Sequence, residues 1–199
     1  MGGITEPEFI LELQGIVKKN FLSKKSPLGN SYELLHNFTE NEIIPIIHKK
    51  RITLSIVELT TCGLLSDLLT GKSGASHFFL MGIIPYNSNV KQQIKIPPEL
   101  LQFGGPGTVS SETARMLAMN VRNISGSILG VAETGLLASN ELAKKKTKKK
   151  PGKVFLSIVS ENSSLEKQLK IQSDLPRKLM RHEIAFRVLQ SLKTFLDNN

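Results

Sequence analysis

The stretch from Ile52 to Lys91 constrains the fold of this chain more than any other part of it. It opens with an apolar run, ITLSIVE, and closes with a second, HFFLMGIIPY, and such runs predict strands covered on both faces of a sheet. Between the runs, leucines recur at three- and four-residue spacing over residues 64–69, and Gly71 marks the end of a helix. The order of strand, helix and strand predicts a β-α-β unit.

The turn between the first strand and the helix is the expected position of a binding site. Ligands of open α/β sheets bind beyond the carboxyl ends of strands, where free backbone N–H groups gather at a helix N-terminus. Glu58 to Gly63 should therefore line any site, and Thr60 or Thr61 can cap the helix. Glu58 ends a buried strand, so its carboxylate needs hydrogen-bond partners whatever its role.

The rest of the chain predicts a mixed sheet between two layers of helices. Ser110 or Ser111 can cap a helix that follows the GGPGT loop. Three more strands and a last helix are predicted at about residues 127–132, 152–160, 165–172 and 176–196. Strict alternation in the last strand marks an exposed antiparallel edge. We expect a three-layer α/β/α sandwich with a mixed, mostly parallel sheet.

Residues 1–38 precede this pattern and are predicted to form an N-terminal helical extension to a domain over residues 39–199. An apolar stripe runs through this extension at helical spacing and needs a surface to pack against. Its members are Phe9, Ile10, Leu13, Ile16 and Val17. The stripe covers one edge of the domain or, alternatively, serves as an arm for oligomerisation or partner binding.

Composition narrows the class of protein. A chain of 199 residues, 40% hydrophobic and 22% charged, can bury the core of one domain. It has neither an apolar run long enough to span a bilayer nor a signal-peptide pattern, so we expect a cytoplasmic protein without membrane association. The single cysteine excludes an internal disulfide, and the four histidines lack ligand spacing. We expect neither a structural metal nor a cofactor.

The run KKKTKKK at Lys144–Lys150 supplies six of the positive charges behind the net charge of +9. It could bind nucleic acid, an acidic partner or anionic lipid. Nucleic-acid-binding segments usually interleave arginine or aromatic residues, and none stands here. A solvated loop is the preferred interpretation.

Two collinear motifs, VELTTCGLL and SGASHFFLMGIIPYNSNVK, resemble the signature of the CinA C-terminal domain family, the nicotinamide-nucleotide amidases that hydrolyse NMN to nicotinate mononucleotide and ammonia. The family pattern reads A-E-S-C-T-G-G-L, then G-S-S-x-F-F, then G-x-x-x-Y-S-N-x-x-K. The matching residues are Glu58, Thr61, Gly63, Leu64, Gly74, Ser76, Phe78, Phe79, Gly82, Tyr86 and Lys91. The resemblance covers about residues 40–197 and implies a homo-oligomer that takes NMN or a similar nucleotide.

The departures from the family pattern concern its chemistry. The resemblance places the nucleophilic serine at Leu59 and its activating partners at Tyr86 and Lys91. A leucine cannot attack an amide, so we expect an impaired or inactive member of this NAD-salvage family, a pseudoenzyme. The alternatives are an active NMN amidase with a rearranged nucleophile and a basic interaction protein that binds a polyanion through Lys144–Lys150.

The resemblance also implies a substrate pocket. The residues expected to line it are Glu58, Thr60, Thr61, Gly63, Ser110 and Gly135. Two of its walls are altered, because Cys62 replaces a glycine of the family and the loop after Gly135 lacks the family's second glycine and proline. A loop with fewer glycines cannot approach a ligand as closely. Thr60, Thr61 and Cys62 are the candidates for a replacement nucleophile.

Overall fold

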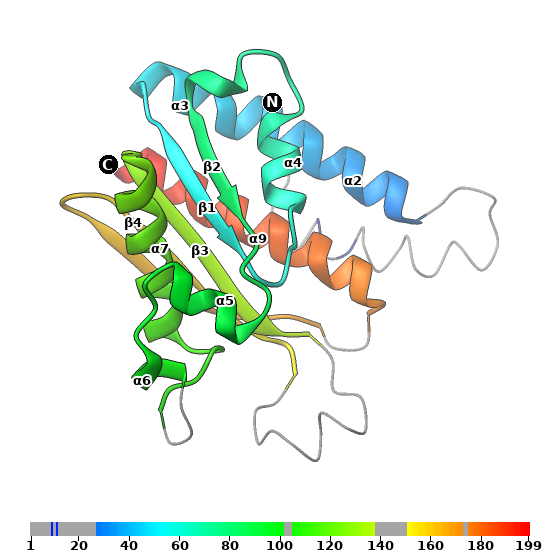
Figure 1. Ribbon diagram of the computed structural model, residues 1–199. Coiled ribbons are helices and arrows are strands. Elements are labelled where there is room, and N and C mark those ends of the chain that lie inside the picture. The colour runs from blue at the N-terminus through cyan, green and yellow to red at the C-terminus, as the bar shows by residue number, and fades with distance from the viewer. Residues whose placement is uncertain (1–8, 10, 12–26, 102–104, 138–150, 173–174) are drawn as a thin grey trace.

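A computed structural model describes residues 9, 11, 27–101, 105–137, 151–172 and 175–199. Within them, one five-stranded sheet lies between two groups of helices (Figure 1). The strands are β1 (Leu54–Glu58), β2 (Phe79–Ile83), β3 (Leu129–Leu136), β4 (Lys153–Val159) and β5 (Ser164–Lys170). The α-helices are α2 (Pro27–Phe38), α3 (Ile44–Lys50), α4 (Leu64–Thr70), α5 (Ser88–Gln93), α6 (Pro98–Leu101), α7 (Ser111–Ser125) and α9 (Arg177–Asn198).

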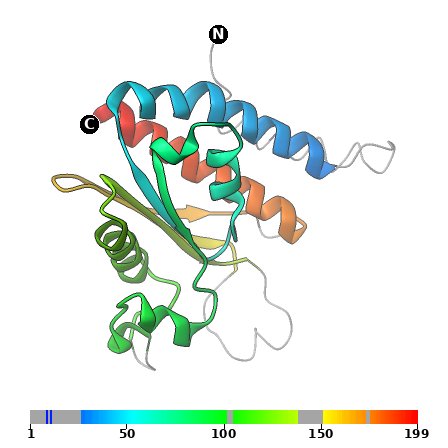
Figure 2. The same cartoon turned by 45° about the horizontal axis from the view of Figure 1, so that its top comes forward.

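The sheet is mixed, with the strand order β2-β1-β3-β4-β5. β1 pairs in parallel with β2 and β3, whereas β4 pairs antiparallel with β3 and β5. Helices α2, α3, α4 and α9 lie on one face, and α5, α6 and α7 lie on the other (Figures 1 and 2). The predicted α/β/α sandwich with a mixed sheet is confirmed, including the antiparallel edge formed by β5.

The β-α-β unit is present, but its two strands lie in different environments. Every residue of β1 is buried, as its sequence predicts. β2 is the opposite edge of the sheet, and its residues alternate between half-buried and exposed. The expectation that both strands are covered on both faces is therefore wrong for β2, whose residues at this edge of the sheet are only half-buried or exposed.

The N-terminal part of the described chain is one run of helical turns. α2 passes into a π-helical turn, η1 (Thr39–Ile43), and then into α3, which has Pro45 in its first turn. Thr39 is buried in this run and its hydroxyl donates to the Leu35 carbonyl at 2.8 Å, so it does not begin a helix. α2 packs on α9 (Figure 2).

Two further expectations concern residues that lie mostly outside the described ranges. Lys144–Lys150 lie outside them, as do most residues of the predicted N-terminal stripe. Within these ranges, no helix has both the length and the apolar character to cross a bilayer. The same residues contain no group of three or more histidine, cysteine, aspartate or glutamate side chains placed to hold a metal ion.

Candidate functional site

Glu58 organises the turn from β1 to α4. Its carboxylate is fully buried and accepts the backbone N–H groups of Gly63 at 2.9 Å, Leu65 at 3.0 Å and Ser66 at 2.8 Å. These are the groups that a helix N-terminus leaves without intrahelical partners. A carboxylate of the chain itself therefore occupies them, and they are not free to bind a ligand, contrary to the expectation from the sequence.

A second buried carboxylate, Glu133 of β3, lies in register with Glu58. It accepts the backbone N–H groups of Thr60 at 2.8 Å and Thr61 at 2.9 Å, and it also contacts both threonine hydroxyls. Burial raises the pKa of Glu133 to about 7, with a smaller contribution from the Glu58 charge and against the opposing effect of these hydrogen bonds. Glu133 was not predicted as a site residue, although a single carboxylate inside the apolar run LGVAETG indicates a buried acidic group.

Thr61 connects the two carboxylates. Its hydroxyl oxygen lies 2.7 Å from Glu58 Oε2 and 2.8 Å from Glu133 Oε1. A hydroxyl has one proton to donate, so it satisfies one of the two oxygens at a time. The threonine hydroxyls in this turn are thus committed to internal hydrogen bonds.

Leu59 is turned away from this cluster. Its side chain is 8% exposed and packs in an apolar group with residues of α7, including Leu117 and Val121, and with Ile96. Its backbone N–H donates to the Glu133 carbonyl. The position that the resemblance assigns to a nucleophile therefore carries a packed hydrophobic side chain.

Lys91 and Tyr86 meet only through a backbone carbonyl. Lys91 is 3% exposed, its ammonium donates to the Tyr86 carbonyl at 3.2 Å, and burial lowers its pKa. The Tyr86 side chain is 60% exposed, and its hydroxyl accepts from Arg177 Nη2 at 3.3 Å. The two side chains expected to act together thus have different partners.

Ser110 and Gly135 perform local structural roles. Ser110 is the N-cap of α7, since its hydroxyl accepts the Thr113 N–H at 3.2 Å. At Gly135, an added Cβ would lie 2.5 Å from a methyl carbon of Val154. Glycine is therefore needed there for the close approach of β4 to β3.

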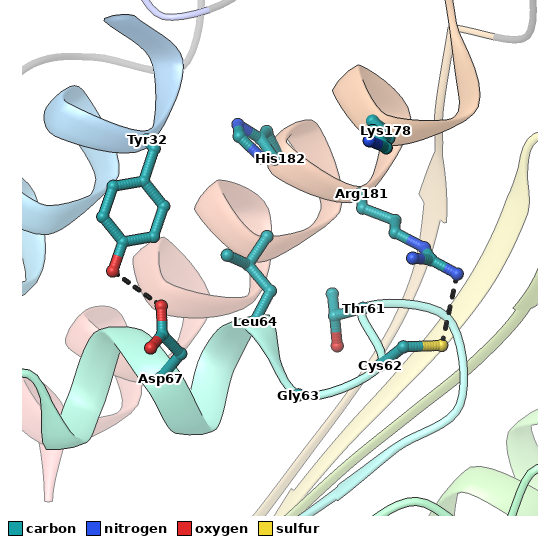
Figure 3. Close-up of a pocket in the computed structure, with 9 residues that line it drawn as sticks. All are labelled: Tyr32, Thr61, Cys62, Gly63, Leu64, Asp67, Lys178, Arg181 and His182. Atoms are coloured by element: carbon teal, nitrogen blue, oxygen red, sulfur yellow. Dashed lines mark hydrogen bonds between the residues drawn. The ribbon is translucent and has the colours of Figure 1, made fainter. Parts of the chain in front are cut away.

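A pocket of about 510 Å³ opens between the β1–α4 turn and α9 (Figure 3). Its lining residues are Tyr32, Thr61, Cys62, Gly63, Leu64, Asp67, Lys178, Arg181 and His182. Of the residues predicted for the site, Thr61, Cys62 and Gly63 line it. The three α9 residues of the lining were not predicted, because basic side chains on a helix of a lysine-rich chain are usually exposed to solvent.

Cys62 and Arg181 meet at one end of the pocket. Arg181 Nη2 donates to Cys62 Sγ at 3.5 Å (Figure 3). Burial raises the pKa of the Cys62 thiol, and the positive charge of Arg181 only partly offsets this effect. Cys62 also has a positive φ of 54°, a conformation that favours glycine, the residue that the resemblance places at this position.

Two further lining residues, His182 and Tyr32, each have a hydrogen-bond partner. His182 Nδ1 lies 2.6 Å from the Ser31 hydroxyl, and burial lowers the pKa of His182, which keeps the ring neutral at pH 7. The Tyr32 hydroxyl donates to Asp67 at 2.6 Å, and this bond raises the pKa of Tyr32 to about 12.

The fold and site define an α/β/α sandwich protein whose first strand-to-helix turn is built on two buried carboxylates. The model of the CinA C-terminal domain family matches residues 36–196, and the chain belongs to this family. Competence-damage inducible proteins of Bacillus cytotoxicus and Bacillus thuringiensis (strain Al Hakam) are each 35% identical to it, over 128 and 130 residues. These matches cover 64% and 65% of this chain but only 30% and 29% of the relatives, so the chain spans about a third of their length.

Solved structures of the family share the fold. The competence damage-inducible protein A of Klebsiella pneumoniae superimposes with a TM-score of 0.72 at 16% identity, over 82% of this chain and 97% of that one. The competence/damage inducible protein CihA of Agrobacterium tumefaciens gives a TM-score of 0.69 at 24% identity, over 84% and 96%. At these identities the likeness concerns the fold alone.

Proposed function

We propose that this chain is a divergent member of the nicotinamide-nucleotide amidase family that does not hydrolyse NMN. It acts in the cytoplasm by binding a ligand or a partner and not by catalysis. Leu59 carries the proposal. It stands where the resemblance places the serine nucleophile, and it is buried against α7. Amide hydrolysis through a covalent intermediate needs a nucleophile within reach of a base, and leucine offers none.

The neighbouring hydroxyl and thiol groups do not supply a replacement. The hydroxyls of Thr60 and Thr61 are bonded to the buried carboxylates. Cys62 lies on the α9 side of the turn, and its raised pKa keeps it in the thiol form, which is the poorer nucleophile. Tyr86 and Lys91 are the candidate residual partners of the lost serine.

The test is ammonia release from NMN by the purified chain and by Leu59→Ser, with an active amidase of the family as the positive control. We expect no release by the native chain. We also expect none by Leu59→Ser, because the Tyr86 hydroxyl is exposed and bonded to Arg177. Release by the native chain would overturn the proposal and direct attention to Thr60, Thr61 and Cys62. Release by Leu59→Ser alone would show that only the nucleophile is missing.

A further inference from the structure

We propose that β2 is an open pairing edge of the sheet, where β2 of a second copy of this chain pairs with it in antiparallel orientation across a two-fold axis. The two five-stranded sheets then join into one continuous sheet. This inference goes beyond the proposed function and does not depend on it, because it uses no residue of the β1–α4 turn. The family resemblance implies a homo-oligomer but assigns no surface to it.

The two edges of the sheet differ in charge. β1, β3 and β4 all lie on one side of β2 (Figure 1), so β2 and β5 are the two edges. β5, with the sequence SLEKQLK, exposes Glu166, Lys167 and Lys170 to solvent. Charged side chains, lysine above all, keep an edge strand from pairing with another chain. β2, with the sequence FLMGI, has no charged residue, so this edge lacks the protection that β5 has.

The uncharged segment extends beyond β2 on both sides. Residues 73–90 contain no lysine, arginine, aspartate or glutamate, although 22% of the residues in the chain are charged. Several large apolar or aromatic side chains of this segment are exposed to solvent: Leu80, Ile84, Tyr86 and Val90. Exposed apolar side chains that gather in one short segment of a charged protein indicate a contact surface for another macromolecule.

A second copy of the chain has the properties that a strand paired with this edge needs. Such a strand must have free backbone N–H and C=O groups, and its side chains must be uncharged, because a charge buried at the edge would stay unpaired. β2 itself meets both conditions. The chain has a net charge of +9, so two copies repel each other least where they approach through an uncharged surface. A two-fold axis uses the free edges of both copies and closes the assembly.

The register of the pairing follows from the exposure of residues in and after β2. Leu80, Gly82 and Ile84 are exposed, whereas Met81 and Ile83 between them are half-buried. Leu80 has no partner in β1, since the pairing of these two strands shifts register there. An axis through Gly82 places Leu80 of each copy opposite Ile84 of the other. The cross-strand contacts are then apolar, and the two glycines leave room at the centre.

Sedimentation velocity of the native chain over a range of concentrations tests the association. The paired segment is short, so we expect a reversible equilibrium of monomer and dimer with a Kd in the micromolar range. Leu80→Lys should raise this Kd at least about a hundredfold, because pairing would bury two unpaired ammonium groups. Gln168→Lys adds the same charge to β5 and should leave the Kd within about threefold, which makes it the matched control. Leu80→Ala keeps the edge uncharged and should still form the dimer.

A mixture of two variants tests the register. In the antiparallel pairing, the lysine introduced by Leu80→Lys faces the glutamate introduced by Ile84→Glu in the other copy. Neither variant alone should dimerise, whereas their equimolar mixture should form a heterodimer at least about tenfold tighter than either homodimer. The substituted positions are exposed in the free chain, so each variant should keep the native far-UV circular dichroism spectrum.

Three results would overturn the proposal. A native chain that stays monomeric far above micromolar concentration would show that a second copy is not the partner of this edge. A dimer that Leu80→Lys leaves intact would place the contact on another surface. A mixture of the two variants that stays monomeric would exclude the antiparallel pairing centred on Gly82.

Discussion

Leu59 shows at the residue scale how an altered site becomes part of the core. Its side chain fills space beside α7, so truncation should leave a cavity. We expect Leu59→Ala to lower the free energy of unfolding by about 2–4 kcal/mol, within the range seen for buried leucines. Urea denaturation measures this change, and Leu80→Ala, at a position that is 43% exposed, is the matched control. Equal midpoints for the two variants would show that Leu59 is not a packing residue.

Glu133 predicts a specific pH dependence of stability. The pKa of Glu133 is about 7 in the folded chain, whereas the ordinary value for a glutamate is 4.5. Between these values the folded state holds a proton that the unfolded state has released. The free energy of unfolding should therefore fall as pH rises through this interval, by up to about 1.4 kcal/mol per unit from this group.

The substitution Glu133→Gln isolates this effect, because the amide keeps a neutral group that can bond to Thr60. Urea denaturation at pH 5 and pH 8 should show a smaller loss of stability at pH 8 in Glu133→Gln than in the native chain. Glu166→Gln, on the edge strand β5 and 38% exposed, should behave like the native chain. Identical pH dependence in all three proteins would contradict the raised pKa.

At the scale of elements, the β1–α4 turn combines internal capping with backbone strain. Cys62 and Gly63 both have positive φ values, 54° and 95°. A residue with a Cβ pays about 1–2 kcal/mol for this conformation, and glycine does not. We expect Cys62→Gly to raise the urea midpoint, with a gain of about 1 kcal/mol. Gly63→Ala should lower the midpoint, and a fall in both variants would mean that the Cys62 side chain stabilises the turn more than its conformation costs.

The elements could be predicted from the sequence because their signals are local. The apolar run of β1, the leucine spacing of α4 and the alternation in β5 each depend on a few adjacent residues. The edge position of β2 could not be predicted in this way, since it depends on which strands become neighbours. The capping of α4 was also missed, because Glu58 bonds to N–H groups that lie five to eight residues ahead of it.

At the scale of the whole molecule, the pocket depends on contacts between distant parts of the sequence. Cys62 and Arg181 are separated by 119 positions, and Ser31 and His182 by 151. No local pattern brings such residues together; only the packing of α2, α4 and α9 on one face of the sheet does so. The family resemblance led to Thr61 and Gly63 of the pocket, but it could not supply the α2 and α9 residues that complete the lining.

Phe9, in the N-terminal region, packs in the hydrophobic core of the domain. It lies before the part matched by the family model, yet it is fully buried and its ring stacks on Phe186 of α9 at a centroid distance of 4.1 Å. Loss of a buried aromatic side chain costs about 3–5 kcal/mol. We expect Phe9→Ala to lower the free energy of unfolding by about this amount, whereas Leu11→Ala, at a position that is 63% exposed, should have little effect.

This pair of variants decides whether the N-terminal region is an extension or part of the core. Urea denaturation followed by circular dichroism gives the midpoint and the slope for each chain. A single transition at lower urea in Phe9→Ala, with an unchanged slope, would show that Phe9 and the domain unfold together. An unchanged midpoint would instead favour a separate arm for assembly or partner binding, because such an arm could lose its anchor without weakening the sandwich.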